Sequence, residues 1–110
     1  MRMWMIPPDQ LCRKHLLVEH FEIHKHRHVF LKKQSISGRI EPVTQIEPVS
    51  MENRHNELVN EMIIRGMNHA SPYDQPDISY LPISEQFAKV HIDQSYKDLI
   101  SRCEAIKKII

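Results

Sequence analysis

The sequence predicts an all-α fold, a compact three-helix single domain with long irregular loops that spans residues 1–110. A chain of 110 residues has room for one domain and a modest core. Three stretches repeat apolar residues at helical spacing, and prolines and glycines concentrate in the segments between them. We therefore expect three helices joined by ordered, irregular connections.

The first predicted helix runs from Gln10 to about Lys33. Pro7 and Pro8 stop any earlier helix, Asp9 is a good N-cap, and the stretch that follows contains neither Gly nor Pro. Apolar residues occupy several faces of this helix, which indicates that it is packed on several sides. We expect it to be the central helix of the fold.

The second helix is predicted from about Met51 to Arg65, with Gly66 as its stop. The last helix begins near Asp93, and residues 84–90 suit one further helical turn or two. The predicted buried stripe of the second helix is Leu58, Val59, Met62 and Ile63. The connections 35–50 and 67–84 are dense in Pro, Gly, Asp and Ser and are predicted to be loops.

Composition excludes several classes of protein. Two glycines rule out a glycine-rich nucleotide loop, and Cys12 and Cys103 lie too far apart for a metal-type spacing. The sequence has no signal peptide and no segment of membrane-span length, so we expect a cytoplasmic protein with reduced thiols. Net charge is +1, but residues 24–33, "HKHRHVFLKK", hold four Lys or Arg and no acid. This block fits either an ordinary solvated helix end or a phosphate-binding surface.

A polar stripe follows one face of the first helix. His15, Glu19, Glu22 and His26 fall at i, i+4, i+7 and i+11. The four span about 16 Å, too far for one metal ion, so a site would need one adjacent pair plus ligands from elsewhere. We predict no metal site here. Simple Glu–His pairing and a catalytic carboxylate on a rigid helix both remain open.

Four motifs in order resemble one known family. They are "MRMW" at the start, "HLLVEHFE" on the first helix, "RHNELVNEMIIRGMNH" on the second and "DISYLP" in the loop after it. Together they cover roughly residues 1–27 and 54–82. The chain is similar to the pyrimidine-dimer DNA glycosylases with abasic-site lyase activity, the phage endonuclease V type. The fold of that family is a compact three-helix domain.

The resemblance implies a repair N-glycosylase with an associated β-elimination lyase that acts on damaged pyrimidines and needs no cofactor. It assigns the essential glutamate to Glu22 and the nucleophile to the backbone α-amine of Met1. Arg2 is bulky and should prevent removal of the initiator methionine. An α-amine has a pKa of about 7.7–8.0, so a useful fraction is unprotonated at neutral pH. Trp4 and the methionines at 1, 3 and 5 are expected to pack the N-terminal arm.

Double-stranded damaged DNA is the implied partner of a monomeric enzyme with no membrane association. Residues 69–75 are candidates to accept a flipped base. Arg2 and Lys25 match basic positions of the family. The remaining DNA-binding candidates come from helix geometry and the basic last helix, and are Lys14, His15, Arg27, Arg102 and Lys107. His15 is equally a candidate for a packed histidine satisfied by Glu19.

Two departures from the family bear on function. Phe21 stands where the phage enzyme has an arginine that contacts phosphate, and the aromatic, basic C-terminal tail of that enzyme is absent. Neither change touches the amine or the carboxylate. Action on other damaged bases or on abasic sites alone therefore stays open. So do two other functions, a non-catalytic DNA-binding module and a His/Glu metal-binding protein.

Overall fold

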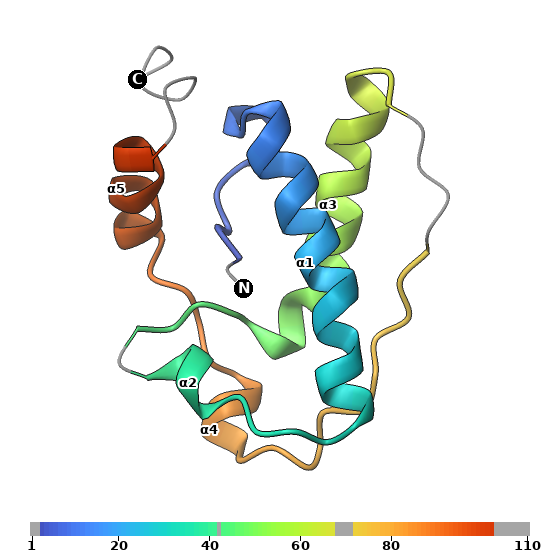
Figure 1. The fold of residues 1–110 in the computed structure, drawn as a ribbon, viewed down its shortest axis with the longest axis vertical. Coiled ribbons are helices and arrows are strands. Elements are labelled where there is room, and N and C mark those ends of the chain that lie inside the picture. The colour runs from blue at the N-terminus through green and yellow to red at the C-terminus, as the bar shows by residue number, and fades with distance from the viewer. Residues whose placement is uncertain (1–2, 42, 68–71, 103–110) are drawn as a thin grey trace.

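The computed structural model describes residues 3–41, 43–67 and 72–102, and all regular structure within these ranges is helical (Figure 1). This confirms the all-α class. The helices are α1 (Arg13–Leu31), α2 (Ser37–Ile40), α3 (Met51–Ile64), α4 (Ile83–Gln86) and α5 (Ile92–Arg102), with 3-10 turns at Pro8–Gln10 and Pro48–Ser50. No described helix combines the length and the hydrophobicity needed to cross a bilayer.

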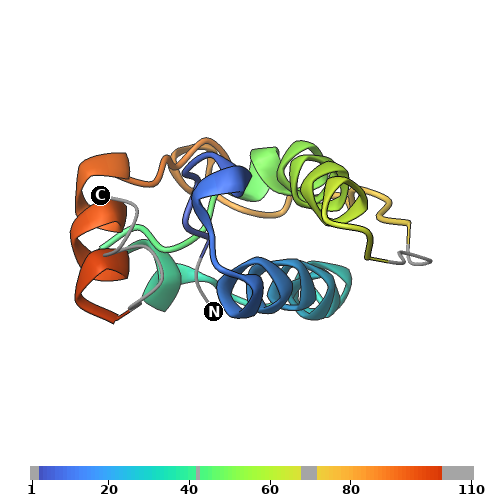
Figure 2. The ribbon, with the colours of Figure 1, turned by 90° about the horizontal axis from the view of Figure 1, so that it is seen from above.

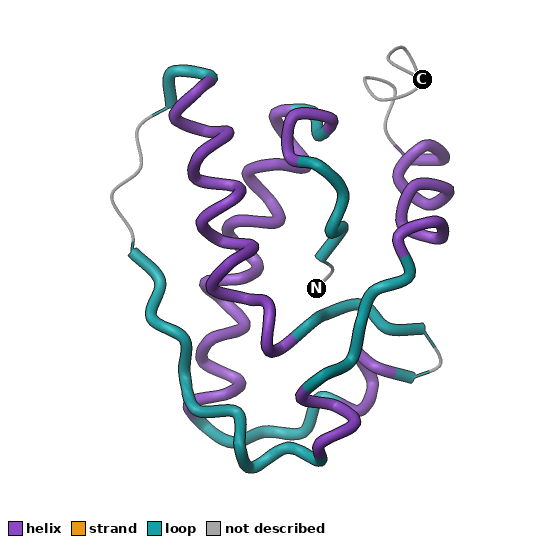
Figure 3. The backbone as a smooth tube through the Cα atoms, turned by 180° about the vertical axis from the view of Figure 1, so that it is seen from behind, coloured by secondary structure: helices purple, strands orange, loops and turns teal. Residues whose placement is uncertain are grey.

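The centre of the fold is the packed pair α1 and α3, which run in opposite directions (Figure 1). Seen from above, the two helices form two layers, with α5 beside them (Figure 2). Seen from behind, the loop 72–82 descends beside α3 and α1 toward α4 (Figure 3). The N-terminal arm, residues 3–7, lies between α1 and α5 (Figure 1).

The start of α1 differs from the prediction. Cys12, not Asp9, is the N-cap, and its Sγ accepts a hydrogen bond from the His15 N–H at 3.5 Å. The prolines instead favour a separate 3-10 turn, after which Leu11 is extended and buried. Burial of Leu11 breaks the continuous helix that the sequence predicts.

The bounds of α3 agree with the prediction, and Gly66 ends it with a φ of +80°, where a Cβ would be strained. Its predicted buried face is partly wrong. Leu58 and Met62 are buried, but Ile63 is 59% exposed and Arg54 is buried in the core. The side chain of Arg54 is accommodated because it donates to both oxygens of Glu19, at 2.6 and 3.1 Å, and to the Ile6 carbonyl at 2.8 Å. A core-facing position is therefore not always an apolar residue.

The N-terminal arm packs as expected. Met3, Trp4 and Ile6 are buried, and the Met3 N–H donates to the Gln45 carbonyl at 2.8 Å. Met1 lies outside the described residues. The arm is thus a fixed part of the core that joins α1 to the loop before α3.

Residues 90–96 are hydrogen-bonded to earlier parts of the chain. The Val90 N–H donates to Glu47 at 2.7 Å, and the Tyr96 hydroxyl donates to Gln10 at 2.7 Å. The turn predicted within residues 84–90 is α4, which begins at Ile83, and α5 begins at Ile92, next to the predicted start.

Candidate functional site

Glu22 lines a pocket of about 330 Å³ at the C-terminal half of α1. The chain turns back after α1 at Lys33, which has a φ of +53°, and the returning segment forms the opposite wall. α1 contributes residues at i, i+3, i+4 and i+7, which share one face of a helix. The lining residues are Glu22, Lys25, His26 and Val29 from α1, and Gln34, Ser35 and Arg39 from the returning segment.

The charges of this pocket suit an anionic ligand beside one carboxylate. Two cations, Lys25 and Arg39, flank the half-buried Glu22. Burial, together with the positive charge of Arg39, lowers the pKa of His26 to about 4, so His26 is neutral at pH 7. Within the described structure, its Nε2 atom is buried and has no hydrogen-bond partner. The pocket therefore offers a carboxyl group, two positively charged side chains and one neutral imidazole whose Nε2 has no hydrogen-bond partner within the described structure.

The four residues of the predicted polar stripe on α1 lie in different environments. Glu19 is fully buried and holds Arg54 in a bidentate ion pair. Burial raises the pKa of the Glu19 carboxyl, and the guanidinium of Arg54 opposes that rise. The His15 ring lies 2.9 Å from the Cys12 Sγ and edge-on to Trp4, at a centroid distance of 5.8 Å. Glu19 thus has a structural role, whereas Glu22 and His26 open onto the pocket.

The basic DNA-binding candidates lie on two sides of α1. Lys14 and Lys25 are exposed and, at 100° per residue, within roughly 20° of each other around the helix. Arg27 is roughly 160° from Lys25 by the same count. Its Nε donates to the Asp74 carbonyl at 2.9 Å. Lys14 and Lys25 therefore share the pocket side of α1, and Arg27 is held against the loop on the other side.

Several predicted site residues lie outside the description. Met1, Arg2, Lys107 and residues 69–71 are outside the described ranges, and Arg102 is the last described residue of α5. The described part of the predicted base-accepting loop packs against α3. Tyr73 is buried with its ring stacked on His55, and Gln75 donates to the Pro48 carbonyl at 3.2 Å.

Comparison with known proteins identifies the family. The family model described as pyrimidine dimer DNA glycosylase matches residues 1–75. That span includes all of α1 and α3 and more than half of the 110 residues. The chain belongs to the pyrimidine dimer DNA glycosylase family. Searches among curated proteins and among solved structures found no match. Family membership supports glycosylase activity on DNA and a role in DNA repair, as the four sequence motifs predict.

One departure from the resemblance lies on the exposed surface of α1 near the pocket. Phe21, at the position where the resemblance to the phage enzyme expects an arginine, is 63% exposed. By helix geometry it lies within roughly 40° of both Lys14 and Lys25. An exposed aromatic ring therefore occupies the surface where the resemblance places a phosphate anchor.

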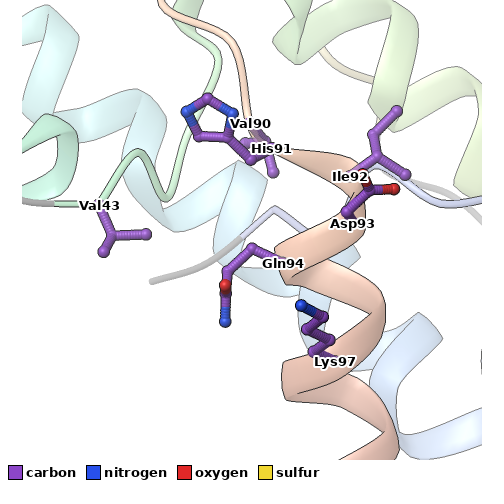
Figure 4. A pocket seen from close by; sticks show the side chains of 7 residues that line it. All are labelled: Val43, Val90, His91, Ile92, Asp93, Gln94 and Lys97. Carbon is purple, nitrogen blue, oxygen red and sulfur yellow. The ribbon is translucent and has the colours of Figure 1, made fainter.

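A larger hollow of about 600 Å³ lies between residue 43 and the start of α5. Figure 4 shows Val43 and His91 on one side of it, with Ile92 and Asp93 on the other. Its described charged groups, Asp93 and Lys97, are exposed on α5. None of its lining residues belongs to the motifs of the glycosylase, so we do not assign the reaction to it.

A second polar cluster lies between α1 and α3. His20 and His24 from α1 meet His55 from α3, with one ring nitrogen of each within 4.8 Å of the others. Sequence analysis missed this group because His55 lies more than 30 residues from His24, and no local spacing relates them. The same is true of Arg39 in the Glu22 pocket. Only the packing of the described segments brings these residues together.

Proposed function

We propose that this family member is a DNA N-glycosylase with an associated abasic-site lyase, acting on damaged pyrimidines in double-stranded DNA. Glu22 and the α-amine of Met1 are the proposed catalytic groups. The observation that carries the proposal is the placement of Glu22, the family's glutamate position, in a pocket with Lys25 and Arg39. A carboxylate beside two cations suits a sugar that becomes positively charged between two phosphates.

The N-terminal arm supports the pairing of Met1 with Glu22. The Met3 N–H donates to Gln45, and the Gln45 N–H donates to the carbonyl of Arg39, which lines the pocket. Two extended residues span at most about 7 Å, so an amine two residues before Met3 has a short reach from this wall. These contacts of the arm support the proposal that the α-amine acts beside the Glu22 carboxylate.

The proposed reaction has two stages. The neutral amine attacks C1′ of the damaged nucleotide, and the C1′–N bond to the base breaks as the base leaves with its electron pair. The amine nitrogen then loses a proton, the C1′–O4′ bond opens and O4′ takes up a proton, which leaves an imine between C1′ and the α-nitrogen. Glu22 stabilises the cationic sugar during base departure. A proton then leaves C2′, and the C3′–O bond breaks by β-elimination, releasing the 3′ phosphate. Glu22 carries protons in this second stage. Lys25 and Arg39 hold the flanking phosphates.

Borohydride trapping tests this mechanism directly, because borohydride reduces the imine to a stable amine. Incubation with abasic or ultraviolet-irradiated duplex should give a covalent protein–DNA adduct. Glu22→Gln should lower the single-turnover rate of cleavage by roughly 10²–10⁴-fold. Glu52→Gln makes the same chemical change at an exposed residue of α3 and should retain the rate.

Blocking the N-terminal amine should abolish the adduct. An adduct that forms at full yield with a blocked terminus would refute Met1 as the nucleophile. Salt-sensitive DNA binding with no cleavage and no adduct would instead support a non-catalytic DNA-binding module. Trapping on abasic duplex alone would restrict the activity to the lyase step.

A further inference from the structure

We propose that His20, His24 and His55 bind one divalent transition metal ion of the zinc type, which fastens α1 to α3. The three side chains converge from two helices. The ring centroids lie 4.7 Å apart for His20–His24, 4.9 Å for His20–His55 and 4.7 Å for His24–His55. Three imidazoles meeting in this way present their nitrogens to one point.

The distances fit a tetrahedral ion after small side-chain movements. Zinc–nitrogen bonds of about 2.0–2.1 Å place neighbouring ligand nitrogens about 3.3 Å apart. The Nε2 atoms of His24 and His55 are already 3.0 Å apart, and one nitrogen of each of the three rings lies within 4.8 Å of the others. Because His20 and His24 are one turn apart on a single helix, their relative position is fixed before the metal arrives.

The surroundings also suit a metal ligand set. The Nδ1 atom of His55 lies 3.1 Å from the Asn56 Oδ1. When that Nδ1 carries the proton, the amide oxygen accepts it, and Nε2 is left as the ligand atom facing His24. The buried ring of Tyr73 stacks on His55 and packs edge-on to His24, which forms an apolar wall on one side.

The ligand type narrows the choice of ion. Within the described residues the group contains only histidines, without a carboxylate or a thiol. Neutral imidazoles favour zinc, copper, nickel and cobalt over magnesium and calcium, which prefer oxygen. His20 and His24 are half-buried, so the fourth position is open to a water molecule.

The site is separate from the proposed glycosylase chemistry. By helix geometry, His20 and His24 each lie roughly 160° from Glu22 around α1. The ion therefore acts as a brace between α1 and α3. Whether the protein binds this ion and whether it forms the borohydride adduct are therefore independent outcomes.

Metal titration of the full-length protein tests the site. Protein stripped with a chelator is titrated with Zn²⁺ by calorimetry and with Co²⁺ by visible absorption. We expect one ion per chain and the ligand-field bands of a four-coordinate site. Zinc at 100-fold over its Kd should raise Tm by roughly 10 °C or more. The absence of Zn²⁺ uptake in the calorimetric titration would overturn the proposal.

Matched variants identify the ligands. His24→Ala and His20→Ala change half-buried side chains, and each should weaken Zn²⁺ binding by at least roughly tenfold. His28→Ala removes an exposed histidine one turn further along α1 and should bind normally. If His28→Ala loses as much affinity as His24→Ala, or if neither variant loses any, the assignment is wrong. Metal-free protein should still form the borohydride adduct.

Discussion

The two long sides of α1 carry similar residues but have different chemistry. On one side Glu22, His26 and Arg39 line one pocket. On the other side His20 and His24 meet His55, with their nitrogens within 4.8 Å. In the sequence these residues alternate over seven positions, "HFEIHKH". A helix separates residues two apart by about 200°, so a uniform polar run becomes two distinct sites. The composition of a segment therefore says little about the number of sites it forms.

What joins the two sides is the buried ion pair of Glu19 and Arg54. It links α1 to α3 and, through the Ile6 carbonyl, to the N-terminal arm. Both sites depend on the same placement of α1. Loss of this ion pair should therefore disturb the pocket and the histidine cluster together.

The largest expected effect is that of Arg54→Met. The substitution leaves the Glu19 carboxyl buried without its partner, which should cost about 3–5 kcal/mol of unfolding free energy in urea titrations. Glu57→Gln is the control, since Glu57 is 56% exposed and contacts Arg54 at 3.5 Å; its cost should stay within about 0.5 kcal/mol. The double variant Glu19→Leu with Arg54→Met should recover much of the loss. Equal losses in Arg54→Met and Glu57→Gln would show that the buried pair does not hold the helices.

The next largest effect is the pH dependence of the unfolding free energy that His26, on the pocket side, causes. The pKa of His26 is about 4 in the folded protein, below the value of about 6.5 for a free histidine. Between these values the unfolded chain binds more protons, so this residue's contribution to stability is full above pH 6.5 and is lost as the pH falls toward 4. The loss should reach roughly 3 kcal/mol at pH 4.

Comparing His26→Gln with the wild type isolates the contribution of His26, since all other titratable groups are common to both proteins. The unfolding free energy of the variant should fall less between pH 7 and pH 4.5. His28→Gln makes the same substitution at an exposed position of α1 and is the matched control. An unchanged slope in His26→Gln would mean that His26 is accessible to protons in the fold.

A smaller effect concerns which side of α1 faces DNA. Lys25→Ala should reduce the slope of log K against log salt by about 0.9, the value for one phosphate contact. Arg27→Ala should leave the slope unchanged, because Arg27 is held by the Asp74 carbonyl on the other side. Fluorescence anisotropy over a range of salt concentrations measures both. Equal slopes for the two variants would contradict the assignment of DNA binding to the Lys25 side of α1 alone.

Local signals predicted the helices well and the sites only in part. Apolar spacing and Gly66 gave α3 its bounds, since both act within a few residues. The start of α1 was predicted too early, because burial of Leu11 outweighs the cap preference of Asp9. The family motif marked Glu22. No local sequence pattern identifies Arg39 or His55 as a site residue, because their positions depend on how distant segments pack. Sequence spacing cannot express that relation.

The smallest expected effect is that of a substitution at Phe21, between the two faces of α1. This exposed ring shares a surface with Lys14 and Lys25, where the resemblance expects an arginine. Phe21→Arg should add one phosphate contact, steepening the salt slope by about 0.9 and tightening nonspecific duplex binding severalfold at low salt. Val18→Arg, one turn earlier at a position 46% exposed, controls for added charge alone. If the two variants tighten binding equally, the gain is a general electrostatic effect, and position 21 is no anchor. A selective gain at 21 would show that the surface of α1 that carries Phe21, Lys14 and Lys25 contacts the DNA backbone.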